Sequence, residues 1–351
     1  MITITLTYRN RELAIVKRCL TSLSQQTVNK FAVLLVNYGS SKELSLALQK
    51  LVANFSFVKL LTVPVSKQLW NKSKAINSAL MQCKTPYFFV GDIDMMYRND
   101  FVEKLQQLKN KNSIVYFQVG FLSKEESLKN KAFKDYHLKH ISGKEATGMT
   151  LYPTALLKEI NGYEEFYHGW GAEDSDVHRR IENLGKEVHF YTEEVLMLHQ
   201  WHLRNYRTKD SKEPFHTTLE KINHAYYKKV IENHKVQANI GFEWGMIQEA
   251  CDFDTSEKIC IKNEKNEVEA FLKGILQEKK NRLNIYITKH PAYKNKKNVL
   301  KRVLKKKFKE FYSLQEINNL LLLEIISNYR NSYYEYEWDK EKETINLKIQ
   351  L

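Results

Sequence analysis

Residues 87–97 read YFFVGDIDMMY, an apolar run that ends in two aspartates, Asp92 and Asp94. The apolar part, Tyr87–Val90, is predicted to be a buried strand. Strands and helices alternate before it: strands are expected at Ile2–Leu6, Phe31–Val36 and Val58–Val63, and helices at Glu12–Gln25, Lys42–Asn54 and Ser73–Met81. This rhythm predicts an α/β fold with a mostly parallel sheet flanked by helices, which binds its ligands at the carboxyl ends of the strands.

The rest of the chain predicts a continuation of this domain and a second, smaller one. A helix (Phe101–Lys109) and a strand (Ser113–Val119) come next, and the charged stretch Ser123–Lys144 is expected to be mobile. Beyond about Pro214, Lys and Glu dominate the composition. Further elements are expected at Ile259–Lys262, Glu267–Gln277, Leu283–Ile287, Asn298–Tyr312 and Tyr333–Trp338. The prediction is a catalytic domain over residues 1–250 and a basic α/β or helical module over residues 251–351.

Composition limits the classes of protein that the chain can represent. With 351 residues, 43% of them hydrophobic, the chain can bury a substantial core. The first residues show no signal-peptide pattern, and the longest apolar run, Leu320–Ile326, is too short to span a bilayer. The four cysteines form no CxxC pair, which suits a reducing compartment. A cytoplasmic protein is therefore expected. Its net charge of +14 points to a negatively charged partner: a nucleic acid, a nucleotide or an anionic lipid surface.

The pair Asp92 and Asp94 is the first candidate site. Both follow a buried strand, so both carboxylates can face one crevice at the end of the sheet. Two carboxylates there repel each other unless a cation stands between them, and Mg²⁺ or Mn²⁺ would also bridge a diphosphate. The alternative is an ordinary turn or helix cap, where Asp is common.

Two histidines in LHQWH (198–202) form the second candidate. His199 and His202 follow an extended run and lie downstream of an acidic cluster. Imidazole ligands would favour Mn²⁺ over Mg²⁺, whereas the alternative is a pair of structural histidines.

Cations in two stretches of the sequence suggest a phosphate site. TYRNR (7–11) places Arg9 and Arg11 after the first strand, where a planar guanidinium can bind phosphate and Tyr8 can stack on a base. WNKSKAIN (70–77) adds Lys72 and Lys74 ahead of a helix. A solvated loop is the alternative for both stretches.

Acidic residues gather again in FYHGWGAEDSDVHRRI (166–181). A helix beginning near Glu173 would account for acidic residues in its first turn, and Asp176 stands four residues before Arg180, a supportive spacing. A helix start does not account for the Gly-Trp-Gly that precedes it.

Taken in order, TYRNR, NYG (37–39), WNKSKAIN, GDID (91–94), GWGAEDSD (169–176) and HQWH (199–202) resemble motifs of the β-1,4-galactosyltransferases and their GT-A relatives. The resemblance covers roughly residues 1–215. It implies a GT-A fold and an inverting, metal-dependent glycosyltransferase that uses a UDP-sugar. Ser175 departs from the family's acidic run, and Tyr8 lacks the family's preceding proline.

The resemblance also implies roles for individual residues. Asp94 would bind Mn²⁺ (or Mg²⁺) with His202, and Asp92 would hold the donor sugar or ribose beside the metal. His199 stands where the family has a methionine ligand, so its role stays open. The residues implied in donor or nucleotide binding are Tyr8, Arg9, Arg11, Asn37, Trp70, Lys72, Lys74, Asp92 and Trp170.

The Gly-Trp-Gly motif has a counterpart in the same resemblance. Trp170, between Gly169 and Gly171, would close over donor and acceptor on a mobile loop, for which glycines provide the backbone freedom. Asp174 would be the general base that deprotonates the acceptor hydroxyl, and Glu173 would hold acceptor hydroxyls. Asp176 is expected to support the helix.

The resulting hypothesis is a transferase that moves galactose or an N-acetylhexosamine onto a saccharide or lipid-linked oligosaccharide during surface-glycan biosynthesis. A bacterial, cytoplasmic enzyme at the inner membrane face is expected. The alternatives are a polymerase-type N-acetylhexosaminyltransferase of the same fold and a basic nucleic-acid-binding protein, which is ranked lower because no groove-reading motif is evident.

A basic segment stands apart from these motifs. Residues 289–309 contain ten Lys or Arg and no acid, and apolar residues from Val299 to Tyr312 fall on one stripe of the expected helix. This pattern predicts either peripheral contact with an anionic membrane through residues 289–312 or a stripe packed within the small domain.

Overall fold

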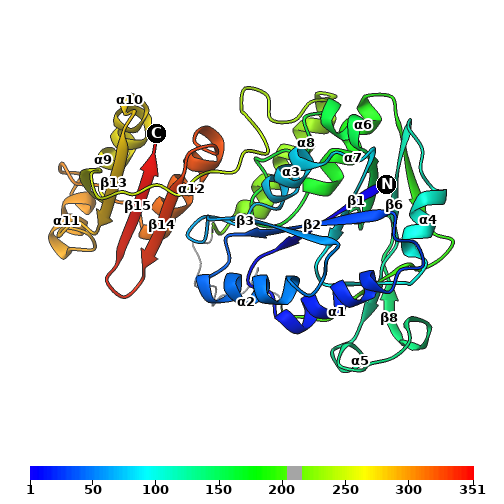
Figure 1. Ribbon diagram of the computed structural model, residues 1–351. Helices are drawn as coiled ribbons and strands as arrows, with labels where there is room; N and C mark the ends of the chain where they lie inside the picture. The colour runs from blue at the N-terminus through cyan, green and yellow to red at the C-terminus, as the bar shows by residue number, and fades with distance from the viewer. Residues whose placement is uncertain (204–215) are drawn as a thin grey trace. The chain divides into compact units, whose positions relative to one another are not determined.

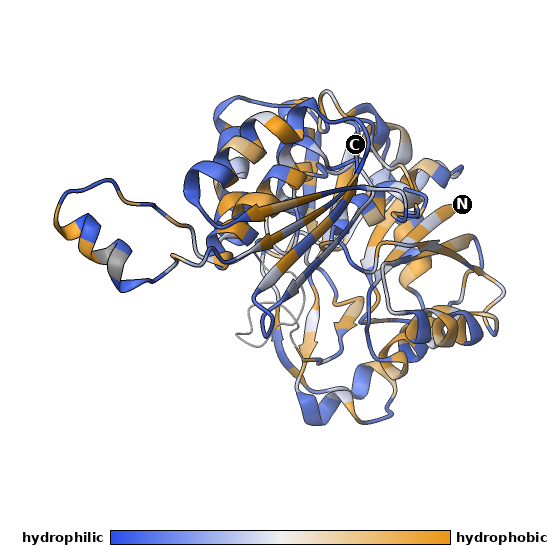
Figure 2. Cartoon of the chain, turned by 90° about the vertical axis from the view of Figure 1, so that its left-hand side faces the viewer, coloured by the Kyte–Doolittle hydropathy of each residue, from blue (hydrophilic) through white to orange (hydrophobic). Residues whose placement is uncertain are grey.

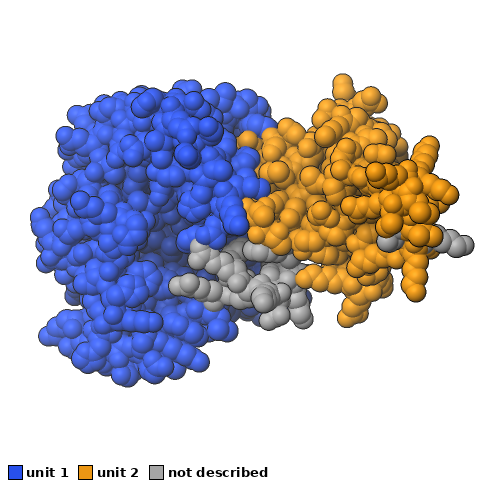
Figure 3. Space-filling model, turned by 180° about the vertical axis from the view of Figure 1, so that it is seen from behind, with its two compact units in different colours: residues 1–66, 70–206, 220–247 blue, residues 67–69, 207–219, 248–351 orange. Residues whose placement is uncertain are grey.

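The computed structural model describes residues 1–203 and 216–351, which form two compact units. The described residues of unit 1 come from 1–66, 70–203 and 220–247, and those of unit 2 from 67–69, 216–219 and 248–351 (Figure 3). The composition change expected near Pro214 lies outside the described residues.

Unit 1 is built on a seven-stranded sheet in the order β10-β6-β9-β4-β1-β2-β3. The strands are β1 (Ile2–Tyr8), β2 (Phe31–Tyr38), β3 (Val58–Val63), β4 (Tyr87–Asp92), β6 (Ser113–Phe117), β9 (Thr150–Pro153) and β10 (Glu187–Tyr191). All neighbours pair in parallel except β9, which runs antiparallel to both β4 and β6. Buried residues on both faces, such as every residue of β1, reflect coverage by helices on both sides.

The helices of unit 1 lie on the two faces of this sheet (Figure 1). They are α1 (Leu13–Ser24), α2 (Lys42–Val52), α3 (Lys72–Gln82), α4 (Phe101–Gln107), α6 (Thr154–Glu159), α7 (Glu173–Asn183) and α8 (Leu219–Glu232). Helices α1 and α2 cover one face, and α3, α7 and α8 lie on the other. The β–α alternation predicted for the first half of the chain is confirmed, and with it the α/β fold.

A second, four-stranded sheet in unit 1 has the order β5-β11-β7-β8. Its strands are β5 (Met95–Tyr97), β7 (Gly120–Leu122), β8 (Leu138–Ile141) and β11 (Met197–His199). The stretch Ser123–Lys144, expected to be mobile, instead contains α5 (Lys124–Ser127), the 3₁₀ turn η1 (Phe133–Asp135) and β8. Glu126 fixes it: this buried carboxylate accepts from Lys129 at 2.7 Å and Lys131 at 2.5 Å, so the lysines of the stretch are partly neutralised.

Unit 2 contains a four-stranded sheet in the order β12-β13-β15-β14. The strands are β12 (Glu257–Lys262), β13 (Arg282–Thr288), β14 (Tyr334–Asp339) and β15 (Thr344–Gln350). The helical elements are α9 (Lys265–Ala270), the π-helical turn η2 (Phe271–Ile275), α10 (Leu276–Glu278), α11 (Lys296–Val303) and α12 (Leu314–Asn328). The prediction of a smaller C-terminal α/β module is confirmed.

One element of unit 2 differs from the expectation, and another was not predicted. The helix predicted over Asn298–Tyr312 ends at Val303, because Lys305 takes a left-handed φ of 53° that an α-helix cannot continue through. The apolar run Leu320–Ile326 belongs to α12, which begins in a capping box of Ser313 and Glu316 and buries its apolar side. No helix among the described residues has the length and apolar composition needed to cross a bilayer.

Candidate active site

The carboxyl ends of three parallel strands meet at one edge of the large sheet. Tyr8, the last residue of β1, lies opposite Asn37 of β2, and Thr7 lies opposite Asp92 of β4. The segments that follow these strands therefore start side by side, as the sequence predicts for a parallel sheet.

Asp94 lies between two imidazoles at this edge. Its carboxylate is 3.0 Å from His202 Nε2 and 3.7 Å from His199 Nε2, and Arg11 approaches to 3.5 Å. The small sheet brings these residues together, since β11 pairs with β5 and the Gln200 N–H donates to the Asp94 carbonyl at 2.9 Å. The ligand atoms of Asp94, His199 and His202 lie within 4.8 Å of one another.

This triad has the chemistry of a metal site. A carboxylate oxygen and two imidazole nitrogens suit Mn²⁺. The Oδ1 atom of Asp94 is buried and accepts no hydrogen bond among the described residues, as expected of an atom reserved for a cation. Phe121 stacks on the His199 ring at 4.7 Å and fixes its plane. The residues present therefore fit the predicted metal.

The electrostatics of the triad also suit a cation. Burial would raise the pKa of Asp94, but His199, His202 and Arg11 outweigh it and hold that pKa well below its usual range. Burial lowers the pKa of His199 and so favours the neutral ring that binds metals.

Lys72 gathers three carboxylates from two distant segments. Its ammonium nitrogen lies 3.2 Å from Asp92, 3.4 Å from Asp174 and 3.9 Å from Glu173. Lys72 is the first residue of α3, and the N-cap residue Asn71 accepts from the Lys74 N–H. Glu173 and Asp174 are the first two residues of α7. These four residues are called the Lys72 cluster below.

Burial and mutual repulsion shape the charges in the Lys72 cluster. Burial disfavours the charge on Lys72, yet the three carboxylates raise its pKa well above the ordinary value. Burial, and then the charge of Asp174, raises the pKa of Glu173 to about 7. Burial likewise raises the pKa of Asp92. Glu173 is therefore partly protonated near neutrality.

The Gly-Trp-Gly segment is a left-handed loop that ends at α7. Gly169, Gly171 and Ala172 have φ values of 74°, 104° and 73°, a left-handed backbone that glycine adopts readily. Trp170 is 50% exposed on this loop. The buried Asn223 of α8 donates to the carbonyls of His168 at 3.0 Å and Trp170 at 3.1 Å, so α8 holds the backbone of this loop.

Asp176 supports the helix, as predicted from its spacing. Its carboxylate lies 2.6 Å from Arg180 and accepts from the Tyr167 hydroxyl at 3.0 Å, all in the interior. Burial raises the pKa of Asp176 to about 6 against the effect of Arg180.

Other predicted residues lie around these groups. Tyr8 is fully buried and donates its hydroxyl to the Arg11 carbonyl at 2.9 Å, so it supports the TYRNR loop from beneath rather than presenting a face to a base. Arg9 donates to the Ser66 carbonyl at 3.1 Å, and Asn37 donates to Ser45 at 2.9 Å. Trp70 packs edge-on against Tyr38 at 5.7 Å.

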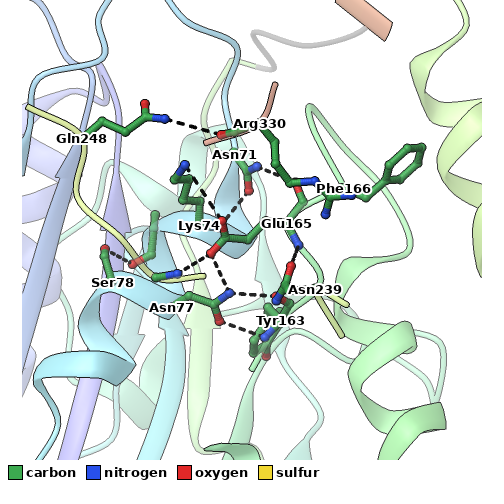
Figure 4. Close-up of polar contacts among 12 residues, drawn as sticks. Asn71, Lys74, Asn77, Ser78, Tyr163, Glu165, Phe166, Asn239, Gln248 and Arg330 are labelled. Atoms are coloured by element: carbon green, nitrogen blue, oxygen red, sulfur yellow. Dashed lines mark hydrogen bonds and ion pairs between the residues drawn. The ribbon is translucent and has the colours of Figure 1, made fainter. Parts of the chain in front are cut away.

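Lys74 is not brought to the Lys72 cluster. It is buried on the other side of α3, with its nitrogen 4.0 Å from Glu165. There it joins a polar network that the sequence did not reveal (Figure 4). Asn77 donates to Glu165 at 3.0 Å and to the Tyr163 carbonyl at 2.7 Å, and Asn71 donates to the Glu165 carbonyl at 2.9 Å. The network joins α3 to the segment that leads into the Trp170 loop.

Comparison with known proteins agrees with this geometry. The family model described as "Glycosyl transferase family 2" matches residues 3–158, and the one described as "N-terminal domain of galactosyltransferase" matches residues 129–202. No curated protein sequence gave a match.

Two solved structures align with part of the chain. GalNAc-T7 with UDP, GalNAc and Mn²⁺ is 13% identical, with a TM-score of 0.49 over 67% of this chain and 50% of that one, so the match spans half of its length. TarS 1-349 of S. aureus with UDP-GlcNAc is also 13% identical, with a TM-score of 0.47 over 68% of this chain and 67% of that one.

The fold, the clustered acids and the two family matches define a glycosyltransferase with the GT-A fold. Within that class, the matching models are those of glycosyl transferase family 2 and of the galactosyltransferases, and these matches bear out the resemblance stated from the motifs.

Proposed function

We propose that the chain is an inverting, metal-dependent hexosyltransferase that moves galactose or an N-acetylhexosamine from a UDP-sugar to a saccharide hydroxyl. The observation that carries the proposal is the Lys72 cluster beside the Asp94–His199–His202 triad. One half of this arrangement suits a diphosphate leaving group, and the other suits a hydroxyl nucleophile.

On the leaving-group side, cations must meet the charge that develops on the diphosphate. The nucleotide is proposed to lie near Arg9 and Arg11, which follow β1, and near Lys72, which begins α3. Asp92 is proposed to hold the donor sugar or ribose. A metal ion held by Asp94, His202 and His199 would supply Lewis-acid stabilisation of the leaving diphosphate.

On the acceptor side, Asp174 is proposed as the general base. It takes the proton of the acceptor hydroxyl as the acceptor oxygen forms its bond to the anomeric carbon. The bond from that carbon to the diphosphate oxygen breaks on the opposite face, UDP leaves with the electron pair, and the configuration inverts. Glu173, with its pKa near 7, is proposed to hydrogen-bond neighbouring acceptor hydroxyls, and Trp170 to cover the sugars.

The cellular setting is proposed from sequence features alone. A cytoplasmic bacterial enzyme of surface-glycan biosynthesis would meet a lipid-linked oligosaccharide at the inner membrane face. The predicted membrane contact through residues 289–312 belongs to this setting.

The test is UDP release from a panel of UDP-sugars with Mn²⁺, compared among wild type and the variants Asp174→Asn and Asp94→Ala. We expect one donor to turn over, EDTA to abolish the reaction, and Asp174→Asn to lower kcat by about 10²–10⁴-fold while UDP still binds. Asp94→Ala should lose metal-dependent binding of UDP. Asp254→Asn, an exposed carboxylate of unit 2, is the matched control and should behave as wild type.

Two outcomes would overturn the proposal. Failure of every UDP-sugar to bind or react with any divalent ion would exclude the nucleotide. Full activity of Asp174→Asn would remove the proposed base. Salt-sensitive binding of DNA or RNA without any donor hydrolysis would instead favour the nucleic-acid alternative.

A further inference from the structure

The basic segment forms a distinct arm of unit 2. We define the basic arm as residues 289–312, between β13 and α12. Its two ends are joined by the fully buried Asn263, which accepts from the His290 N–H at 2.7 Å and donates to the Tyr312 carbonyl at 2.7 Å. The arm is therefore fixed at its base rather than loosely attached.

The arm also has internal order. Asn298 of α11 donates to the Lys309 carbonyl at 2.8 Å and accepts from the Lys309 N–H at 3.0 Å. This double contact holds the chain segment that follows α11 against the helix, so that the helix lies at the outer end of the arm. In Figure 2 the arm stands away from the sheet of unit 2.

One side of the outer helix is apolar and exposed. Leu300 and Val303 of α11, and Leu304 directly after it, are 58%, 72% and 54% exposed, and their spacing places them on one side. At the base, by contrast, Phe311 packs on the rings of His290 at 5.4 Å and Tyr293 at 5.8 Å. Of the predicted apolar stripe, Phe311 is therefore packed, whereas Leu300, Val303 and Leu304 are exposed.

The charges around this apolar face are uncompensated. Lys289 and Lys309, at the base, pair with Glu343 and Glu264. Within the described residues, no ion pair is formed by the cations of the outer part, Lys296, Lys301, Arg302, Lys305, Lys306 and Lys307. An exposed aliphatic face rimmed by unpaired cations matches the interface of an anionic bilayer, where the aliphatic groups enter the acyl boundary and the ammoniums meet phosphates.

We propose that the basic arm is a peripheral docking element that inserts Leu300, Val303 and Leu304 into the surface of an anionic lipid bilayer. A second copy of the chain is a poor occupant of this face, because two arms with ten cations each would repel. A nucleic acid would use the cations but would leave the aliphatic face without a partner.

The test is co-flotation of the full chain with vesicles of phosphatidylcholine, with and without phosphatidylglycerol. Wild type should bind only the anionic vesicles. The triple variant Lys305→Gln, Lys306→Gln, Lys307→Gln should bind about a hundredfold more weakly. The triple variant Leu300→Gln, Val303→Gln, Leu304→Gln should lose about tenfold or more despite its unchanged charge.

Matched controls lie elsewhere on the surface. Lys258, Lys340 and Lys342 changed to Gln remove three exposed charges of unit 2, and Leu46, Ile240 and Ile275 changed to Gln remove three exposed apolar side chains. Both controls should bind vesicles as wild type does. All variants should keep wild-type thermal unfolding, which shows that they fold.

The outcomes separate the occupants. Equal vesicle binding by wild type and the apolar triple variant would overturn insertion, as would an absence of flotation. Tighter binding to duplex DNA or single-stranded RNA than to vesicles would assign the arm to a nucleic acid. Flotation needs neither donor nor metal, so its result is independent of the proposed transfer reaction.

Discussion

At the scale of single residues, Lys72 is the group on which the candidate site depends most. The Lys72 ammonium lies within 3.9 Å of three carboxylates, and without this cation the carboxylates would repel one another strongly. Because the ammonium is nearly buried, its removal would leave unpaired charge in the interior. Lys72 therefore serves both to stabilise the cluster and, in the proposed reaction, to meet the diphosphate.

Gly148 gives a precise way to disturb this cluster. A Cβ added there would lie 3.2 Å from Asp174 Oδ2 and 3.8 Å from Lys72 Nζ, so the carboxylate must shift by a few tenths of an ångström. We expect Gly148→Ala to lower kcat about tenfold, because small displacements of a base are costly, while folding is retained.

The control for Gly148 is Gly274→Ala in η2, where an added Cβ meets nothing within 4 Å. This variant should keep full activity and gain about 0.5–1 kcal/mol of stability, as alanine does over glycine within helices. Steady-state kinetics with the identified donor measures kcat for the two variants, and denaturant unfolding measures the stability of Gly274→Ala. Unchanged turnover in Gly148→Ala would show that the Asp174 position is not critical.

His178 supplies a prediction about pH. Burial lowers its pKa to about 3. Its Nε2 lies 2.9 Å from the Thr150 hydroxyl, which already donates to Thr147, so the neutral ring donates there. The unfolded chain has an ordinary imidazole that binds a proton below pH 6.5. Stability is therefore present above pH 6.5 and is lost as the pH falls toward 3.

Between pH 7 and pH 5 this histidine should cost wild type about 2 kcal/mol of unfolding free energy. The variant His178→Gln should show a correspondingly flatter loss over the same interval, whatever its stability at pH 7. Denaturant unfolding at both values measures the difference. Parallel pH profiles for the two proteins would mean that His178 is not held neutral.

At the scale of elements, the Trp170 loop is positioned by a helix that lies far along the sequence. The side-chain amide of Asn223 in α8 donates to the carbonyls of His168 and Trp170, and Asn223 is fully buried. Tyr226, one turn further on, stacks on Phe166 at 4.4 Å and donates to Glu164 at 3.2 Å. Helix α8 thus holds the chain at Trp170 and in the segment that leads into it.

We expect Asn223→Leu, which keeps the volume and removes both donors, to raise the acceptor KM about tenfold. The affinity for UDP should stay unchanged, because in the proposed arrangement Trp170 covers the two sugars and UDP carries neither of them. Asn183→Leu is the control, since Asn183 donates to the Lys235 carbonyl at 2.8 Å at the far end of α7. A loss of UDP affinity equal to the loss of acceptor affinity would contradict the positioning role.

The same elements show what the sequence could and could not predict. The Asp176–Arg180 pair, the helix start at Glu173 and the glycine positions follow from local spacing and backbone preference. The network of Asn77 and Glu165 does not, because its members are 88 positions apart in the chain. Tertiary packing alone decides that such polar residues are buried, and it leaves no periodic pattern in the sequence.

In the basic arm, by contrast, the sequence predicted a longer helix than the structure contains. Apolar spacing alone predicted one helix over Asn298–Tyr312, but Lys305 breaks it and the chain returns beside α11. A lysine-rich stretch of uniform helix propensity gives no indication of where such a turn falls. The alternation of charged and apolar residues could be recognised in the sequence, but the sequence did not show which apolar residues stay exposed.

At the scale of the whole molecule, metal binding should be confined to one unit. All three candidate ligands, Asp94, His199 and His202, belong to unit 1, and each unit has a core of its own. A ligand that binds only the folded state stabilises it by about 2.7 kcal/mol at a hundred times its dissociation constant. We therefore expect Mn²⁺ to slow amide hydrogen exchange in peptides of unit 1 and to leave those of unit 2 at their original rates.

The double variant His199→Ala, His202→Ala should show no such protection, whereas His189→Ala, an exposed histidine of β10, should respond as wild type does. Hydrogen exchange followed by peptide mass spectrometry measures this without any substrate, so the metal site is tested separately from catalysis. The expected protection includes peptides of β5 and β11, because the ligands or their neighbours lie in these paired strands. Protection that persists in the double variant would place the ion elsewhere and would leave the orphaned Asp94 oxygen without an explanation.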